Sequence, residues 1–163
     1  MKYSPIPKNE DERLKAVYNL SILDTGKEER FDHITKEAIE KLNVPISTIT
    51  ILDKDREWFK SCQGLDNKEG DRAISFCGHA LLASDIFIVE DTLKDSRFKD
   101  NPMVIGKPYV RFYAGISLSD NISNLRVGVF CIKDIKPRKL GVEEINILID
   151  LANRAERELN IKN

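Results

Sequence analysis

The chain has 163 residues, with 26 Lys and Arg against 27 Asp and Glu, and 41% of its residues are hydrophobic. A chain of this length buries roughly 70% of the surface that its unfolded form exposes, so a single domain spanning 1–163 is expected. The formal net charge of −1 argues against a protein that grips nucleic-acid phosphates. The apolar content excludes a disordered chain, and no apolar run approaches the ~18 residues of a membrane span.

The N-terminal stretch carries no signal for export. It is polar and interrupted by Pro5 and Pro7, so it lacks the apolar centre of a signal peptide. Cys62, Cys77 and Cys131 are widely spaced, which suits free thiols in a reducing compartment better than a disulfide framework. We therefore expect a cytoplasmic protein with no membrane and no nucleic acid among its partners.

Hydrophobic periodicity, β-branched runs and turn residues predict helices at both ends of the chain and strands between them. The expected elements in chain order are a helix over 9–23, a second helix that ends at Pro45, strands over 46–52 and 57–62, a short helix over 75–82, a strand over 86–89, an irregular loop over 90–108, strands over 109–118 and 125–133, and a last helix over 142–160. Short turns between consecutive strands imply antiparallel pairing. The predicted fold is an α+β sandwich.

The two long helices carry apolar stripes. The first of them is expected to begin at a capping box formed by Thr25 and Glu28. The last helix has a seam with spacings of 3, 4, 3 and 4 and a second apolar line beside it, namely Ile145, Leu148, Ala152, Ala155 and Leu159, then Ile149 and Leu151. Either both lines form one broad core-facing stripe, or one line faces the sheet while the other meets a second copy of the chain.

Cys77 and His79 form the most suggestive short cluster. A cysteine at a helix N-terminus beside a histidine can have a lowered pKa and act as a nucleophile or redox thiol. We favour the alternative, in which Cys77 packs as a small hydrophobe and His79 makes one hydrogen bond, since no motif supplies a third partner. Cys62, Cys131 and His33 lack the paired spacing of a zinc site, so no metal is expected.

Known catalytic and phosphate-binding motifs are missing from the sequence. There is no G-x-G-x-x-G, P-loop, G-x-S-x-G or H-E-x-x-H pattern. No catalytic residue and no cofactor is therefore predicted.

The segment 90–108 is too long for a simple connection, and loops of this kind are more often functional than not. Its charged residues include Asp91, Asp95 and Arg97, which could bind a cation or a polar ligand. Because the segment lacks the twelve-residue calcium-loop pattern, we favour a solvated loop held together by Asp–Arg contacts.

Arg111 lies within the expected strand 109–118, on the face that it shares with Tyr109 and Tyr113. A charged residue inside a sheet needs a partner, because burying it alone costs several kcal/mol. The partner is either a ligand anion or an aspartate of the preceding loop. We favour the aspartate, which would make Arg111 a latch that orders this loop.

In their order along the chain, short segments resemble the GAF domain family, the small-molecule-sensing modules of bacterial signalling proteins. The segments that carry the resemblance are PKNE (7–10), RL (13–14), ILDT (22–25), FD (31–32), VPI (44–46), WFK (58–60), SFCGHA (75–80), DSRF (95–98), NP (101–102), VRFYAG (110–115) and GVFCI (128–132). The chain is most similar to the subgroup placed ahead of diguanylate cyclase, phosphodiesterase or histidine kinase modules.

The resemblance implies a central antiparallel sheet of about six strands, with the terminal helices on one face and the short helix and long loop on the other. In this family a ligand pocket lies under the loop, here 90–108, and the terminal helices often form a dimer. The candidate ligand-binding residues carried over by position are Trp58, Cys77, His79, Asp91, Arg97, Phe98, Arg111 and Tyr113.

Some features of individual family groups are absent. The N-K-F-D-E pattern of the cyclic-nucleotide-binding members does not occur, and Gly78 separates Cys77 from His79 where bilin-attaching members have a Cys-His dipeptide. Free methionine sulfoxide reductases share the fold, and Cys77 is similar to one of their cysteines. The strand 109–118 lacks the second cysteine that such an enzyme would have.

The leading hypothesis is a non-enzymatic sensory module of bacterial signal transduction that binds an unknown small molecule beneath loop 90–108. Occupancy would change the packing of the terminal helices and so bias an output domain. That domain is expected on another chain or in a longer protein, because 163 residues leave no room for it. The alternatives are a thiol-dependent redox enzyme in which His79 lowers the pKa of Cys77, and a dimerising scaffold with a collapsed pocket.

Overall fold

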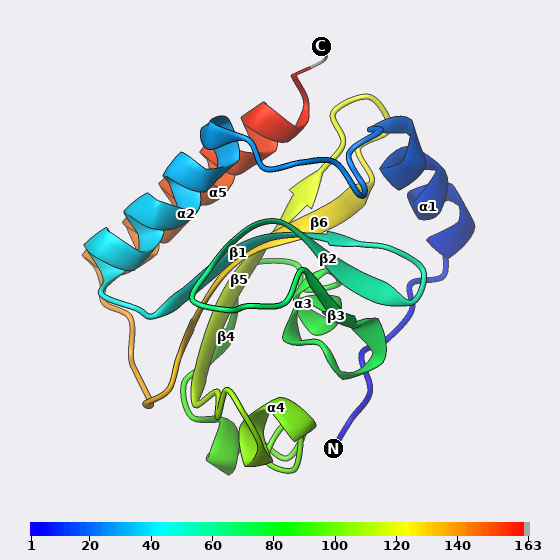
Figure 1. The fold of residues 1–163 in the computed structure, drawn as a ribbon. Coiled ribbons are helices and arrows are strands. Elements are labelled where there is room, and N and C mark those ends of the chain that lie inside the picture. Colours follow the sequence, from blue (N-terminus) through cyan, green and yellow to red (C-terminus); the bar gives the residue numbers. More distant parts are fainter. Residues whose placement is uncertain (162–163) are drawn as a thin grey trace.

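The computed structural model describes residues 1–161. Its centre is a six-stranded sheet in the order β3-β2-β1-β6-β5-β4, and every neighbouring pair of strands is antiparallel (Figure 1). The strands are β1 (Ile46–Leu52), β2 (Arg56–Gln63), β3 (Glu69–Asp71), β4 (Phe87–Val89), β5 (Phe112–Ser119) and β6 (Arg126–Asp134). The predicted α+β fold with an antiparallel sheet is confirmed.

Long helices cover one face of the sheet, which we call the helix face. The helices α2 (Glu29–Leu42) and α5 (Val142–Leu159) lie side by side there, and α1 (Glu10–Asn19) packs near β6 (Figure 1). Phe31, Phe130 and Leu151 are fully buried in this layer. Burying one such side chain stabilises the fold by roughly 2 kcal/mol, so this core is a major source of stability.

Short elements cover the opposite face, which we call the lid face. They are the 3-10 helices η1 (Arg72–Ile74) and η2 (Thr92–Lys94) and the helices α3 (Phe76–Ala80) and α4 (Pro102–Ile105). A second hydrophobic cluster, separate from that of the helix face, forms beneath them. We refer to these elements and the loops between them, residues 72–111 without strand β4, as the lid.

The alternation of side chains along a strand explains how β6 serves both faces. Phe130 and Ile132 belong to the core of the helix face, whereas Val129 and Cys131 belong to the cluster of the lid face. Lys133 continues the second series and is 2% exposed. β6 therefore places the Cys131 thiol and the Lys133 ammonium group on the lid face.

Two predicted features near the N-terminus are wrong. The first helix ends at Asn19 rather than at residue 23, and Ser21 has a positive φ of 52° that turns the chain away. The capping box does not form, because the Thr25 hydroxyl donates to the Ile22 carbonyl at 2.6 Å. The second helix begins only at Glu29.

Two further differences concern strands. The chain turns at Tyr109, whose φ is 60°, so β5 begins at Phe112 rather than at residue 109. The charged segment after β2 contains the short strand β3, which pairs with β2 through Glu57 and Gly70. Its polar sequence gave no alternating pattern from which a strand could be predicted.

The last helix begins where it is predicted, and its inner face is broader than a single seam. Leu148, Leu151 and Ala152 are all buried, while Ile149 is 39% exposed. Leu151 therefore belongs to the core and not to an outward-facing second line. An apolar contact available to a second copy is reduced to positions such as Ile149.

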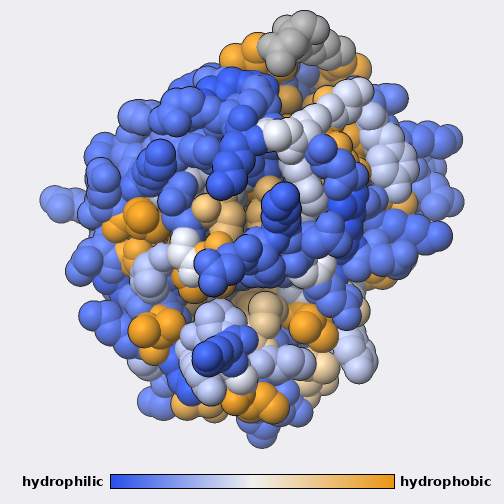
Figure 2. All heavy atoms as spheres, in the orientation of Figure 1, coloured by the Kyte–Doolittle hydropathy of each residue, from blue (hydrophilic) through white to orange (hydrophobic). Residues whose placement is uncertain are grey.

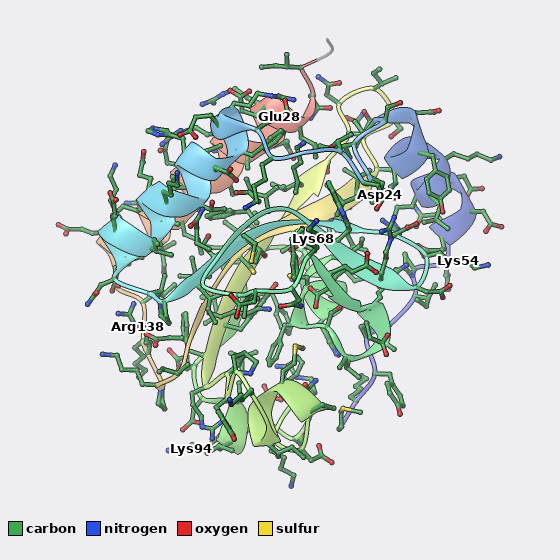
Figure 3. All side chains as sticks on the ribbon, viewed as in Figure 1. Asp24, Glu28, Lys54, Lys68, Lys94 and Arg138 are labelled. Atoms are coloured by element: carbon green, nitrogen blue, oxygen red, sulfur yellow. The ribbon has the colours of Figure 1, made fainter. Side chains whose placement is uncertain are left out.

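Polar side chains dominate the face shown in Figure 2, with apolar side chains scattered among them. Asp24 and Glu28, labelled in Figure 3, lie in the connection between α1 and α2. Asp24 pairs with Arg56 at 2.8 Å and Glu28 with Lys60 at 2.6 Å, so this connection is held to β2. Among the described helices, none combines the length and the apolar character needed to cross a bilayer.

Candidate functional site

Three aromatic rings form a stack beneath the lid. The Phe76 ring lies 4.4 Å from that of Phe98 and 5.2 Å from that of Tyr113, measured between centroids. All three side chains are fully buried. Tyr113 lies over Gly115 of its own strand, where a Cβ atom would collide with the Tyr113 hydroxyl. The aromatic stack therefore fills the place into which Tyr113 points.

His79 lies at the edge of this stack. Its ring meets Phe98 edge-on at 4.8 Å, and its Nε2 atom is 3.2 Å from the Lys2 carbonyl oxygen. Arg97 lies over the rings of Phe87 and Phe98 at 5.0 and 5.3 Å and pairs with Asp95 at 2.7 Å. Burial lowers the pKa of His79, and the nearby Arg97 adds to this effect. A neutral His79 that packs against aromatic rings and makes one hydrogen bond agrees with the alternative that the sequence favoured, in which His79 does not activate Cys77.

A hydrogen-bonded group of hydroxyls and thiols, which we call the thiol network, lies deeper against the sheet. Tyr113 donates its hydroxyl proton to the Cys77 sulfur at 3.1 Å. The Thr48 hydroxyl lies 3.1 Å from the Cys131 sulfur and 2.7 Å from the Thr50 hydroxyl. Every one of these five residues is fully buried. The polar side chains of β1 thus meet the cysteines of α3 and β6 on the lid face.

Two buried charges, Glu57 of β2 and Lys133 of β6, flank the thiol network. Each residue is 2% exposed. Burial raises the pKa of Glu57, with the attraction of Lys133 acting against it. Burial would lower the pKa of Lys133, but the attraction of Glu57 and of the thiols outweighs it and raises the pKa. Oε1 of Glu57 has no hydrogen-bond partner within the described part of the chain.

The structure brings five of the eight candidate ligand-binding residues together. They are Cys77, His79, Arg97, Phe98 and Tyr113, which line one side of the lid face. Trp58 lies elsewhere, because it belongs to the hydrophobic core of the helix face. Asp91 caps η2, where its carboxylate accepts a hydrogen bond from the Leu93 amide at 3.1 Å.

The Arg111 side chain binds a backbone carbonyl of the preceding loop, and not an aspartate as predicted. Its Nη1 atom donates to the carbonyl oxygens of Val104 at 2.8 Å and Val110 at 3.3 Å. Because Arg111 precedes β5, its side chain is not held inside the sheet. The latch therefore connects the start of β5 with α4 through a backbone carbonyl. The expected Asp–Arg contact within the loop is present between Asp95 and Arg97.

The sequence did not draw attention to Glu57, Lys133 or Cys131 as site residues. A charged residue beside an apolar one in a predicted strand is the signal that could have found Glu57, which precedes Trp58, and Lys133, which follows Ile132. Cys131 carries no such signal, because its place beside the Thr48 hydroxyl depends on how β1 pairs with β6.

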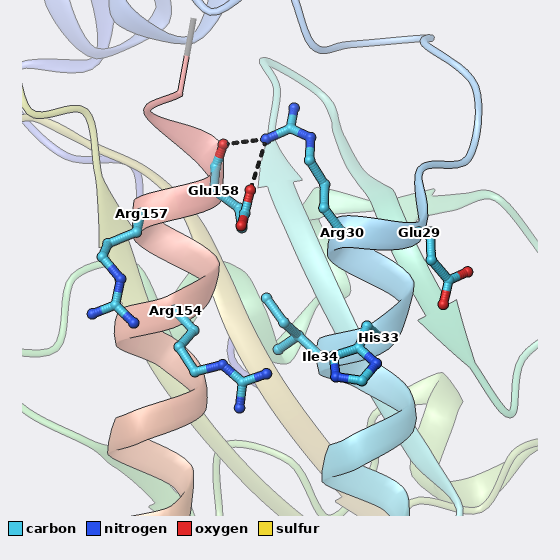
Figure 4. A pocket seen from close by; sticks show the side chains of 7 residues that line it. All are labelled: Glu29, Arg30, His33, Ile34, Arg154, Arg157 and Glu158. Carbon is cyan, nitrogen blue, oxygen red and sulfur yellow. Dashed lines mark hydrogen bonds and ion pairs between the residues drawn. The ribbon is translucent and has the colours of Figure 1, made fainter.

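Two open hollows lie away from the lid face. One of about 360 Å³ lies between α2 and α5 and is lined by charged side chains, including Arg30, Arg154 and Glu158 (Figure 4). Arg30 donates there to the carbonyl and the carboxylate of Glu158. A larger one, of about 800 Å³, lies where the end of α1, the β5–β6 turn and the end of α5 meet.

Comparison with known proteins identifies the family. The model of the GAF domain family matches residues 27–159. A cyclic di-GMP phosphodiesterase of Pseudomonas aeruginosa is 40% identical over 138 residues, which are 85% of this chain and 23% of that protein. The chain thus spans about a quarter of the length of this relative.

Solved structures share the fold at low sequence identity. The GAF domain of an Acinetobacter phosphoenolpyruvate-protein phosphotransferase has a TM-score of 0.62 at 14% identity, covering 91% of this chain and 92% of that one. A type II free methionine-R-sulfoxide reductase from Thermoplasma acidophilum has a TM-score of 0.64 at 14% identity, covering 80% and 90%. A domain of a putative sensor histidine kinase from Sinorhizobium meliloti has a TM-score of 0.61 at 14% identity, covering 83% and 92%. The chain belongs to the GAF domain family, a family of regulatory and sensory modules in signalling proteins.

Proposed function

We propose that this module binds a small molecule on its lid face and transmits its occupancy to the flanking helices. The supporting observation is the pair of buried charges, Glu57 and Lys133, with a carboxylate oxygen that lacks a partner among the described residues. Leaving a buried charge without hydrogen bonds costs several kcal/mol. Hydrogen bonds from a polar ligand to these groups would offset this cost. Ligand binding would therefore explain why two charged residues are buried here.

Entry of a ligand requires the lid to move, because the aromatic stack fills the lid face. Its contacts with the sheet include the hydrogen bond from the Arg111 amide to the Asp134 carbonyl of β6 at 2.8 Å. Its helices are too short to be stable on their own. Displacement of Phe98 and the loop around it would break the aromatic stack, whose Tyr113 is the cross-strand partner of Lys133. The pocket would then be a minor conformation that a ligand stabilises.

A strap formed by residues 1–8 connects the lid with α1. The Ser4 hydroxyl donates to the Arg72 carbonyl at 2.6 Å, and the Lys2 amide donates to the Arg97 carbonyl at 3.0 Å. The strap passes so close to α3 that a Cβ atom on Gly78 would collide with Ser4. Arg72 in turn forms an ion pair with Glu10 of α1. Movement of the lid would therefore reach α1 through the strap.

The receiver of this signal is proposed to be an output domain or a partner protein, and the module itself a homodimer through its terminal helices. The exposed Val142 and Ile149 of α5 are apolar positions that such a dimer would cover. Sedimentation tests this part of the proposal, because a monomer at tens of micromolar concentration would contradict it.

Native mass spectrometry of the purified protein tests ligand binding. We expect a retained small molecule in the unmodified protein, and its loss in Glu57→Gln and in Lys133→Met. Trp58→Phe is the matched control, since Trp58 lies on the helix face, and it should retain the molecule. Absence of any bound compound, together with unchanged hydrogen exchange of the lid after incubation with a small-molecule extract of cells, would contradict the proposal.

A dimerising scaffold is the second candidate function, because the aromatic stack leaves the lid face filled. This function predicts a dimer in sedimentation without a retained molecule. A thiol enzyme based on Cys77 is less favoured. Burial raises the pKa of Cys77 well above its usual range, and Cys131 raises it further, whereas a nucleophilic thiol requires the opposite.

A further inference from the structure

A third hollow, which we call the junction hollow, lies at the edge of the lid. Its lining comes from the strap, the start of α1, the end of α3 and the turn that leads into β6. Its volume is about 290 Å³, close to the lower end of the range of pockets that hold small molecules, ~300 Å³. The charged side chains of this lining are Arg13 and Arg126, and no carboxylate is among its residues.

Arg126, the first residue of β6, is half-buried and has no acidic partner. Its Nη1 atom donates to the carbonyl oxygens of Leu81 at 2.9 Å and Ala83 at 2.6 Å, beside the end of α3. Within residues 1–161 its Nε and Nη2 atoms make no hydrogen bond, and its charge makes no ion pair. Part of this guanidinium group is therefore available to a ligand.

Arg13 of α1 is only 2% exposed, and its hydrogen bonds are incomplete. Its Nε atom pairs with Glu10 at 2.6 Å, and its Nη2 atom donates to the Leu52 carbonyl at 2.7 Å. Its Nη1 atom reaches only the Arg126 carbonyl, at 3.5 Å, which is longer than the usual 2.7–3.2 Å of such a bond. Nη1 of Arg13 can therefore bind a better acceptor.

Positive charge is in excess at this junction. Glu10 pairs with Arg72 as well as with Arg13, so one carboxylate serves two buried arginines. Burial and the repulsion by Arg72 lower the pKa of Arg13 despite its hydrogen bond to Glu10. The attraction by Asp53 is smaller than this repulsion. A bound anion would offset the excess that Arg126 increases further.

Neutral residues complete the lining of the junction hollow. Leu81, Leu82 and Leu125 form an apolar wall, and Leu82 is 38% exposed. Asn9 precedes α1, and its side chain makes no capping hydrogen bond to the helix. Its amide can therefore donate to a ligand. Two cationic groups, a free amide and an apolar wall are the features that a small amphipathic anion requires.

We propose that the junction hollow binds a small organic anion, whose carboxylate or phosphate group lies between the guanidinium groups of Arg13 and Arg126. Guanidinium donors bind both kinds of oxyanion through charge-assisted hydrogen bonds. A short apolar part of the ligand lies against the three leucines. This site is separate from the lid face and does not depend on a ligand there, since neither Glu57 nor Lys133 lines it.

Such a ligand would join parts of the fold that a moving lid must separate. Arg126 holds the end of α3 to the start of β6, and Arg13 belongs to α1. An anion that bridges the two arginines fastens the end of α3 to α1 and favours the closed lid. The junction hollow would thus be a regulatory site for the opening of the lid.

Titration of the full chain with sodium hexanoate, hexyl phosphate and 1-hexanol at constant ionic strength tests the site, with amide chemical shifts as the readout. The three probes share their apolar chain and differ in the head group. We expect saturable shifts at Leu81, Leu82 and Arg126 with at least one anion, and binding of hexanol that is weaker by about tenfold or more. Tighter binding of hexyl phosphate assigns the ligand to the phosphates, and tighter binding of hexanoate assigns it to the carboxylates.

A pair of variants tests the role of the arginine. Arg126→Gln should weaken the binding of the anions about tenfold and leave that of hexanol nearly unchanged. Arg157→Gln is the matched control, because it removes the same charge from α5, and it should bind like the unmodified protein. If Arg126→Gln does not fold, the comparison of the three probes in the unmodified protein decides. Equal affinity for hexanol and the anions, an equal loss in Arg157→Gln, or shifts that do not saturate would overturn the proposal.

Discussion

The two faces of the sheet are closed by different means. The helix face is covered by helices of 14 and 18 residues over aliphatic and aromatic side chains. The lid face is covered by helices of at most 5 residues over stacked rings, thiols and two buried charges. Short helices contribute little stability of their own. The helix face therefore supplies most of the stability, whereas the lid face holds the buried polar and charged groups. Substitutions on either face can test this division.

The largest contrast is expected between two adjacent residues of β6, Lys133 on the lid face and Ile132 on the helix face. Lys133→Met removes the charge that opposes Glu57 and should lower the free energy of unfolding by about 3 kcal/mol at pH 7. Ile132→Val removes one methylene and should cost about 1 kcal/mol. Urea unfolding of both variants measures the difference.

The two losses should also differ in their pH dependence. Burial raises the pKa of Glu57 above its unfolded value of 4.5, and without Lys133 it rises further. Since folded Lys133→Met then binds the Glu57 proton more tightly than the unfolded chain does, its deficit should shrink as pH falls from 7 toward 4.5. The deficit of Ile132→Val should stay constant. A deficit of Lys133→Met that is independent of pH would show that Glu57 is not the group left unpaired.

The second contrast concerns the strap and uses two glycines. Gly78→Ala places a Cβ atom against Ser4 and should cost roughly 1–3 kcal/mol, because the strap must shift. Gly26→Ala is the matched control, since a Cβ atom there meets nothing within 4 Å. Limited proteolysis and hydrogen exchange should show residues 1–8 loosened in the first variant only. Equal protection of the strap in both would mean that it is not anchored at α3.

The sequence was most informative where hydrophobic periodicity decides the structure. The last helix begins at Val142 as expected, because its apolar residues face both α2 and the sheet. The capping box failed because Thr25 found a nearer acceptor in the Ile22 carbonyl. The start of β5 was misplaced because the left-handed backbone of Tyr109 is not encoded by its residue type.

The candidate site could be predicted only in part, for a different reason. His79, Phe98 and Tyr113 meet as their motifs suggest, because these residues lie in or beside one lid. Trp58 lies on the helix face because it pairs with Ile51, whose side chain belongs to the core of that face. The apolar residues of β1 and β2 alone do not show which face of the sheet each of them takes.

The third contrast concerns the latch. Arg111→Ala removes the hydrogen bond to the Val104 carbonyl and should reduce the stability of the lid by about 1 kcal/mol. Hydrogen exchange should increase over residues 90–108 and stay unchanged in α2 and α5. Arg157→Ala on α5 serves as the control and should leave the lid unaffected. Unchanged protection over 90–108 in Arg111→Ala would refute the latch.

The smallest effect is expected at an ion pair that joins α2 to α5 on the helix face. Arg154 donates to Glu37 at 2.7 Å, and this hydrogen bond lowers the pKa of Glu37 to about 2 from 4.5. Arg154→Met should therefore cost only about 0.3–1 kcal/mol at pH 7, because partly exposed pairs are screened by water. Since the folded pKa lies below the unfolded one, the contribution is fully present above pH 4.5 and is lost as pH falls toward 2. The unfolding free energies of the variant and the unmodified protein should thus converge in acid, whereas a difference that persists there would assign the loss to the packing of the Arg154 stem between the two helices.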